Sequence, residues 1–172
     1  MRALLVVAQE NFRDEEYSVP KGVLEKAGVA VITASPEGGT AKGMLGAKVR
    51  VDLRLEEVNP SDYDAVVVVG GAGSPKYLWG NGELNRILKS ASGSGKVVAA
   101  ICLSGAALAK AGVLKGKNAT VFETPDSLDA LRDGGASYIR KDVVVDGKTI
   151  TASGPAAAET FGKRILEALK TG

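Results

Sequence analysis

Four short apolar runs constrain the fold of this chain more than any other feature. They are rich in β-branched residues, are continuous rather than alternating, and lie at 3–7, 30–33, 65–69 and 97–101. Runs of this kind are typical of strands buried on both faces of a parallel sheet. Apolar residues at helical spacing follow the first and third runs, at 19–27 and 83–92. The order therefore predicts an α/β fold with a mainly parallel, doubly wound sheet.

The second half of the chain continues the alternation. We expect helices at 106–111 and 127–132, a strand at 119–122, and a final helix from Pro155 to about Lys170. Strands at 143–145 and 149–152 flank Asp146-Gly147, a pair that suits a tight hairpin turn. The Gly-rich segment 38–55 predicts a small edge hairpin. No linker or repeat divides the chain, so residues 1–172 are predicted to form a single domain.

Net charge and the N-terminal sequence limit the partners and the compartment that can be expected. The chain has 22 basic and 20 acidic residues, and its net charge of +2 gives no electrostatic reason to expect nucleic acid or a membrane as partner. The apolar N-terminal stretch is too short for a signal peptide or a membrane span. A single cysteine permits no internal disulfide, which agrees with a reducing compartment. We therefore expect a cytoplasmic protein.

The chain contains no histidine. A histidine base is the usual partner of a cysteine or serine nucleophile, and zinc sites rely on His or on several Cys. Catalysis must therefore use Cys, carboxylates, Lys, Tyr or backbone dipoles. We expect neither a metal nor a cofactor.

Cys102 directly follows the buried run 97–101 and shortly precedes a helical segment. A nucleophile at so tight a turn needs small residues two positions to either side, and here they are Ala100 and Ser104. The helix N-terminus would direct N–H groups at the sulfur and lower the thiol pKa toward neutrality. This interpretation requires the sulfur to lie exposed in a polar pocket. The alternative is a buried core cysteine, the usual fate of a lone Cys.

Other polar groups are predicted at the same edge of the sheet. The loop Gly70-Gly71-Ala72-Gly73 can form an oxyanion hole beside Cys102 if their strands are neighbours, a phosphate loop for a flavin or nucleotide, or a plain tight turn. The carboxylates of 14–16 follow the first strand. One of them, if buried, would stay protonated and donate to sulfur; otherwise the cluster is a solvated helix start. Glu123 and Thr124 reach the same edge.

Several motifs in order give the chain a family resemblance. They are Glu16 four residues before Pro20, Val68-Val69-Gly70-Gly71, Ala100-Ile101-Cys102, the VVVDG segment at 143–147, and Thr151-Ala152-Ser153-Gly154-Pro155. With them the chain resembles, over nearly its whole length, the superfamily of the PfpI intracellular proteases and the DJ-one stress proteins. The resemblance implies a flavodoxin-like three-layer sandwich with a nucleophile elbow, and a homodimer or higher oligomer. It also implies Cys102 as the reactive thiol, Glu16 as the carboxyl bonded to it, and the N–H groups of Gly71 and Leu103 as the oxyanion pocket.

The chain departs from the family pattern where that pattern has histidine. The protease-like branch has His directly after the cysteine, where this chain has Leu103. The stress-protein branch has His before a proline about twenty residues later, where this chain has Thr124, here assigned to the substrate pocket. The Gly-Pro that follows the elbow in the family is Ser104-Gly105 here. Without histidine in any subunit, a Cys–His peptidase mechanism cannot operate.

The leading hypothesis is a stress-response enzyme of the glyoxalase or deglycase type. It would act through Cys102 and Glu16 on small α-oxoaldehydes or on their adducts with protein. The alternative is a non-catalytic redox sensor or chaperone, in which Cys102 oxidises to a sulfinate that accepts a hydrogen bond from protonated Glu16. A cysteine peptidase, which the family name suggests, is disfavoured, and a flavin-binding module is favoured least.

Overall fold

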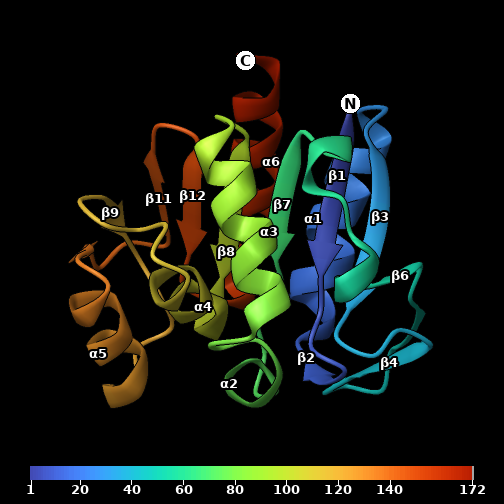
Figure 1. Cartoon of the computed structure of the whole chain (residues 1–172), viewed down its shortest axis with the longest axis horizontal. Helices are drawn as coiled ribbons and strands as arrows, with labels where there is room; N and C mark the ends of the chain where they lie inside the picture. The colour runs from blue at the N-terminus through green and yellow to red at the C-terminus, as the bar shows by residue number, and fades with distance from the viewer. Residues whose placement is uncertain (172) are drawn as a thin grey trace.

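The computed structural model describes residues 1–171 and is built on a seven-stranded sheet of order β11-β12-β8-β7-β1-β3-β6 (Figure 1). Its strands are β1 Arg2–Val6, β3 Ala30–Ser35, β6 Leu53–Arg54, β7 Ala65–Val68, β8 Val97–Ile101, β11 Val143–Asp146 and β12 Thr149–Ala152. Every neighbouring pair is parallel except β11 and β12, which form the predicted hairpin. The predicted parallel α/β sheet is confirmed.

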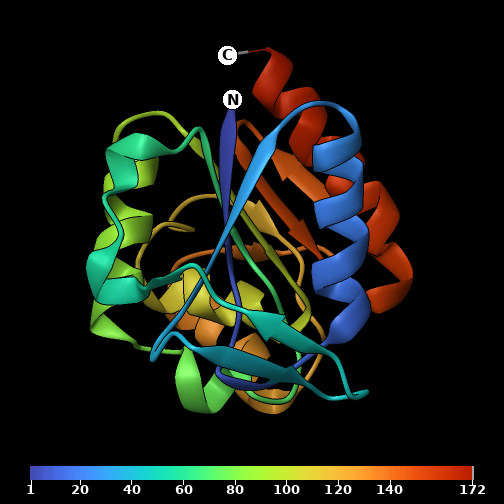
Figure 2. The same cartoon turned by 90° about the vertical axis from the view of Figure 1, so that its right-hand side faces the viewer.

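Helices cover both faces of this sheet and give the expected three-layer, flavodoxin-like sandwich (Figure 2). On one face α1 Asp14–Lys26 packs against α6 Ala158–Lys170. On the other lie α3 Gly82–Gly93 and α4 Gly105–Lys110, with α5 Pro125–Asp133 against α4. The apolar stripe of α3 is buried as its spacing predicts, through Leu84, Ile87, Leu88 and Ala91. Among residues 1–171 no helix combines the length and apolar character that a membrane crossing requires.

Two smaller sheets lie beside the main one. The predicted edge hairpin is β4 Thr40–Gly43 with β5 Lys48–Arg50, and β4 also pairs with the short strand β2 Glu10–Phe12. The second is a parallel pair, β9 Asn118–Ala119 and β10 Ser137–Tyr138. The strand predicted at 119–122 is therefore shorter than expected. Residues 120–122 lie outside this strand pair, and the Phe122 N–H donates to the Cys102 carbonyl, at 3.2 Å.

Helix starts differ from the sequence expectation at functionally important points. Helix α1 begins at Asp14, so the carboxylates of 14–16 form its first turn, where negative charge is favourable. The last helix opens with a 3₁₀ turn, Pro155–Ala157, before α6. A 3₁₀ turn, Cys102–Ser104, also joins β8 to α4. The carboxyl ends of β1, β7 and β8, the lower ends in Figure 1, thus bring these turns to one edge of the sheet.

Candidate active site

Cys102 occupies a strained strand-to-helix turn. Strand β8 ends at Ile101, and Cys102 takes a φ of +61° before the chain enters the 3₁₀ turn. Positive φ is uncommon for a residue with a side chain, and within 1–171 only Asn11 shares it among non-glycine residues. Ala100 and Ser104, two positions to either side, are fully buried. The turn has the backbone geometry of a nucleophile elbow.

The Gly-rich loop lies beside this elbow because β7 and β8 are neighbours, with Val68 paired to Ala100. A Cβ at Gly70 would stand 2.6 Å from the Cβ of Cys102 and 2.5 Å from Oε1 of Glu16. A Cβ at Gly73 would overlap the Glu10 carbonyl oxygen. Glycine at these two positions therefore lets the loop pack closely against the Cys102 turn and against the segment that contains Glu10 and Glu16.

Glu16 lies fully buried in the first turn of α1, across Gly70 from Cys102. No residue within 1–171 gives either of its oxygens a well-formed hydrogen bond. Burial raises the pKa of Glu16 to about 7, although the Cys102 thiol and the Arg13 charge favour its ionised form. The predicted buried carboxyl is therefore present, and a large fraction of it holds a proton at neutral pH.

Cys102 is only 7% exposed. Burial first, and then the charge of Glu16, raise the pKa of Cys102 to about 12, while the N–H groups of Leu103 and Gly71 act to lower it. This corrects the expectation of a thiol pKa near neutrality, because desolvation and the adjacent acid outweigh the short helix α4. Repulsion from Glu16 vanishes when Glu16 is protonated. The two groups are therefore coupled and share one negative charge at neutral pH. Glu16 carries it in the major form because its pKa is the lower, and a thiolate beside protonated Glu16 is the minor form.

The sulfur faces a cavity of about 230 Å³. Its lining joins the predicted Glu16, Gly71, Cys102 and Leu103 with Arg13, Met44, Ala72, Phe122 and Pro155, which sequence reasoning did not assign to the site. The walls are mostly apolar, so the expectation of an exposed sulfur in a polar pocket was wrong, although the acid and the amides are in place. Pro155 ends the motif that begins at Thr151, and this motif is the one sequence signal for any of these additional residues.

Met44 reaches the pocket from the turn between β4 and β5, far from Cys102 in sequence. The Asp14 carboxylate holds this turn by accepting hydrogen bonds from the N–H groups of Leu45 and Ala47, at 3.1 and 3.0 Å. The Met44 sulfur accepts a hydrogen bond from the Ala72 N–H, at 3.4 Å. The side chain thus closes one wall of the pocket, and no sequence spacing could have predicted it.

Thr124, assigned to the substrate pocket on the family pattern, does not line it. Its hydroxyl oxygen caps helix α5 by accepting from the Ser127 N–H at 3.0 Å, so the side chain is already engaged. Glu123 is also turned away and binds Arg140 and Tyr138 at the surface. The strand-edge argument placed both residues near the site correctly, but local hydrogen bonds hold their side chains elsewhere.

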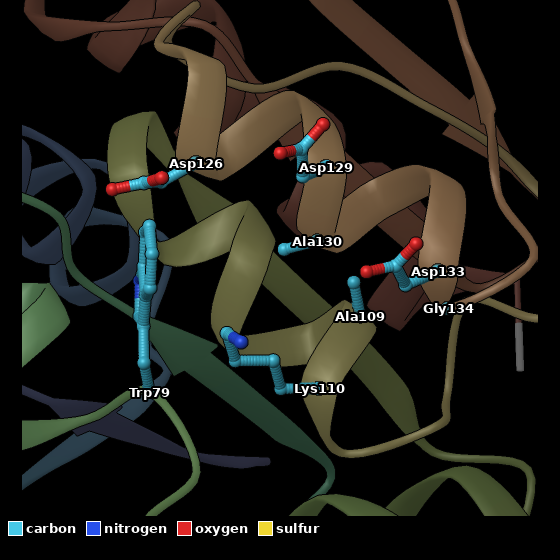
Figure 3. A pocket seen from close by; sticks show the side chains of 8 residues that line it. All are labelled: Trp79, Ala109, Lys110, Asp126, Asp129, Ala130, Asp133 and Gly134. Atoms are coloured by element: carbon cyan, nitrogen blue, oxygen red, sulfur yellow. The ribbon is translucent and has the colours of Figure 1, made fainter.

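A larger cavity of about 490 Å³ lies next to the elbow, with Trp79 in its wall (Figure 3). Its charged lining residues are Lys110 from α4 and Asp126, Asp129 and Asp133 from α5. The Lys110 ammonium stands 5.6 Å from the centre of the Trp79 ring. The Trp79 Nε1–H donates to the Leu103 carbonyl at 3.0 Å. No thiol or hydroxyl side chain lines this cavity, whereas the smaller one joins the elbow cysteine to a buried acid, so the smaller one is the candidate active site.

Comparison with known proteins identifies the family. A family model described as DJ-1/PfpI matches residues 1–168. The chain belongs to the DJ-1/PfpI family. The protein MJ0967 of Methanocaldococcus jannaschii is 46% identical over 169 residues, which cover 98% of this chain and 82% of that protein. The deglycase PH1704 of Pyrococcus horikoshii is 34% identical over 170 residues, covering 99% of this chain and all of the deglycase.

A solved structure agrees with this assignment. The ThiJ/PfpI domain protein from Brachyspira murdochii superposes with a TM-score of 0.93 at 34% identity, over 99% of this chain and 97% of that one. The predicted family and fold are therefore confirmed.

Proposed function

We propose that this DJ-1/PfpI family member is a Cys102-dependent enzyme of the glyoxalase or deglycase type, acting on α-oxoaldehydes or their adducts. The observation that carries the proposal is the pairing of an elbow cysteine with a buried acid whose pKa is about 7. Such a pair can supply both nucleophile and proton carrier without histidine. The deglycase name of the Pyrococcus horikoshii relative supports the same chemistry.

The first step is addition of the Cys102 thiolate to the aldehyde carbon of the substrate. A C–S bond forms, and the electron pair of the C=O bond moves to oxygen. The N–H groups of Gly71 and Leu103, which already favour charge on the sulfur, stabilise this oxyanion. Glu16 then gives its proton to the oxygen, which leaves a hemithioacetal and a Glu16 carboxylate.

The second step is a 1,2-shift of hydrogen. The Glu16 carboxylate removes the proton from the carbon that bears sulfur, and the C–H electron pair forms the C=C bond of an enediolate. The hydroxyl on the sulfur-bearing carbon passes its proton to the oxygen of the former ketone. Glu16 then gives the proton that it removed to the former ketone carbon, which leaves a thioester. Water hydrolyses the resulting thioester, which releases a 2-hydroxy acid and restores the thiol. For an adduct, the Cys102 thiolate forms the C–S bond as the C–N bond breaks, and Glu16 gives its proton to the nitrogen, so that a neutral amine leaves and the same hemithioacetal results.

Lactate production from methylglyoxal tests the proposal. The wild type should form lactate, and both Cys102→Ser and Glu16→Gln should abolish it. Release of amine from a methylglyoxal-treated peptide, measured before free aldehyde is consumed, separates deglycase from glyoxalase activity. Absence of product from the wild type, or undiminished product from Cys102→Ser, would contradict the assignment.

A redox-sensing role is the second candidate, and the unpartnered oxygens of Glu16 favour it. A protonated Glu16 can donate to a sulfinate on Cys102, which would stabilise the oxidised form. Intact-mass analysis after mild peroxide should then show two added oxygens, and Glu16→Gln should alter how fast they appear. A thiol that stays unmodified would remove this candidate.

A further inference from the structure

Two buried serines link the elbow at Cys102 to the segment that follows the Gly-rich loop. Ser104 ends the 3₁₀ turn that begins at Cys102, Ser74 begins the short helix α2 Ser74–Tyr77, and both are fully buried. The Ser104 hydroxyl donates to the Val69 carbonyl at 2.7 Å, and the two serine oxygens are 2.8 Å apart. Because Ser104 uses its proton on Val69, Ser74 donates to Ser104.

This hydrogen-bond chain connects the two segments that carry the N–H donors. The Ser74 backbone N–H donates to the Gly71 carbonyl at 3.1 Å, and Leu103 directly precedes Ser104. Val69 starts the Gly-rich loop, so the Ser104 hydroxyl ties the elbow to that loop at its origin.

We propose that Ser74 and Ser104 are positioning residues that set the distance between the N–H groups of Gly71 and Leu103 at the Cys102 sulfur. Donors of this kind act only when held within hydrogen-bond range of the charge they stabilise. The oxyanion part of the inference rests on the proposed function. The part that concerns the resting thiolate does not, because the same N–H groups face the sulfur before any substrate binds.

The test uses Ser104→Ala and Ser74→Ala, with Thr33→Val as matched control. Thr33 also loses a buried hydroxyl bond, 2.7 Å to the Tyr17 hydroxyl, but it lies in β3, away from the elbow. Cys102 is the sole thiol of the chain, so the rate of alkylation by iodoacetamide against pH reports on it alone. Lactate formation from methylglyoxal gives kcat and KM in parallel.

We expect Ser104→Ala to lower the alkylation rate about tenfold at every pH, both on the rise and on the level part above about pH 7, while the midpoint that Glu16 sets stays in place. Ser74→Ala should lower the rate by less, and Thr33→Val should leave it unchanged. Because the serines act on donors rather than on binding, kcat of Ser104→Ala should fall about tenfold with KM nearly unchanged.

Unchanged alkylation rates in both serine variants, with losses of melting temperature like that of Thr33→Val, would show that the hydroxyls serve packing alone and overturn the proposal. Should Ser104→Ala fail to fold, Ser74→Ala decides by its own alkylation rate. A wild type without lactate formation would refute the proposed function, while the alkylation profiles would still decide the role of the serines.

Discussion

Glu16→Gln should remove the pH dependence that one buried carboxyl gives to stability. Burial raises the pKa of Glu16 from 4.5 to about 7. A group whose pKa rises on folding stabilises the protein fully below its unfolded pKa, and this stability is lost as pH rises through the folded pKa. At about 1.4 kcal/mol per pH unit, the protein loses about 3 kcal/mol of unfolding free energy from this group between acid and neutral pH. Glutamine keeps the shape and removes the titration.

Urea unfolding of the wild type and Glu16→Gln at about pH 4 and about pH 8 measures the effect. The stability of the variant relative to the wild type should increase by about 3 kcal/mol from the lower to the higher pH. Cys102, whose pKa is raised to about 12, does not titrate in this window.

Glu15→Gln is the matched control, because Glu15 is the preceding residue of the same helix. It is ion-paired with Arg13, and its pKa is lowered rather than raised, so its removal should bring no gain at higher pH. A constant difference between the wild type and Glu16→Gln would mean that Glu16 titrates as an ordinary carboxyl. It would then hold no proton for Cys102 at neutral pH, and the shared-charge argument would fail.

Three further outcomes follow from the site. Alkylation of Cys102 by iodoacetamide should rise about tenfold per pH unit up to about pH 7 and then level off, whereas a midpoint at the ordinary thiol value would contradict charge sharing with Glu16. Met44→Ala should speed reaction with a bulky maleimide relative to iodoacetamide, and an unchanged ratio of rates would show that Met44 does not limit access. Gly73→Ala should cost about 1–3 kcal/mol in urea unfolding, because its Cβ would overlap a backbone oxygen, whereas Gly82→Ala, with open space around it, should cost nothing.

The backbone of the site could be predicted from the sequence because it follows from local patterns. The continuous apolar run before Cys102 predicts a buried strand, and small residues at 100 and 104 permit the tight turn that the structure shows. The Gly-rich loop needed one further fact, that β7 and β8 are neighbours, which the sequence left open. The homo-oligomer implied by the family resemblance stays a prediction, which sedimentation equilibrium can test.

Side-chain surroundings could not be predicted in the same way. The residues alone favoured a solvated helix start at 14–16, and only the family resemblance singled out Glu16, because burial there depends on the approach of Gly70. Met44 arrives through a hairpin turn for which no spacing rule exists. The direction of the Cys102 pKa shift was predicted wrongly because desolvation and the charge of Glu16 are properties of the assembled pocket.

The same pocket explains how acid–base chemistry can take place in a chain without histidine. General acid–base catalysis is most effective when the pKa of the catalytic group lies near the working pH, which is why enzymes commonly use imidazole. Burial places the pKa of Glu16 at about 7, in the range where a histidine would titrate. The proton that histidine would exchange can therefore be exchanged by Glu16. Because the charge is shared with Cys102, removing that carboxyl should also change how the thiol ionises, an effect that no exposed acid of this chain would have.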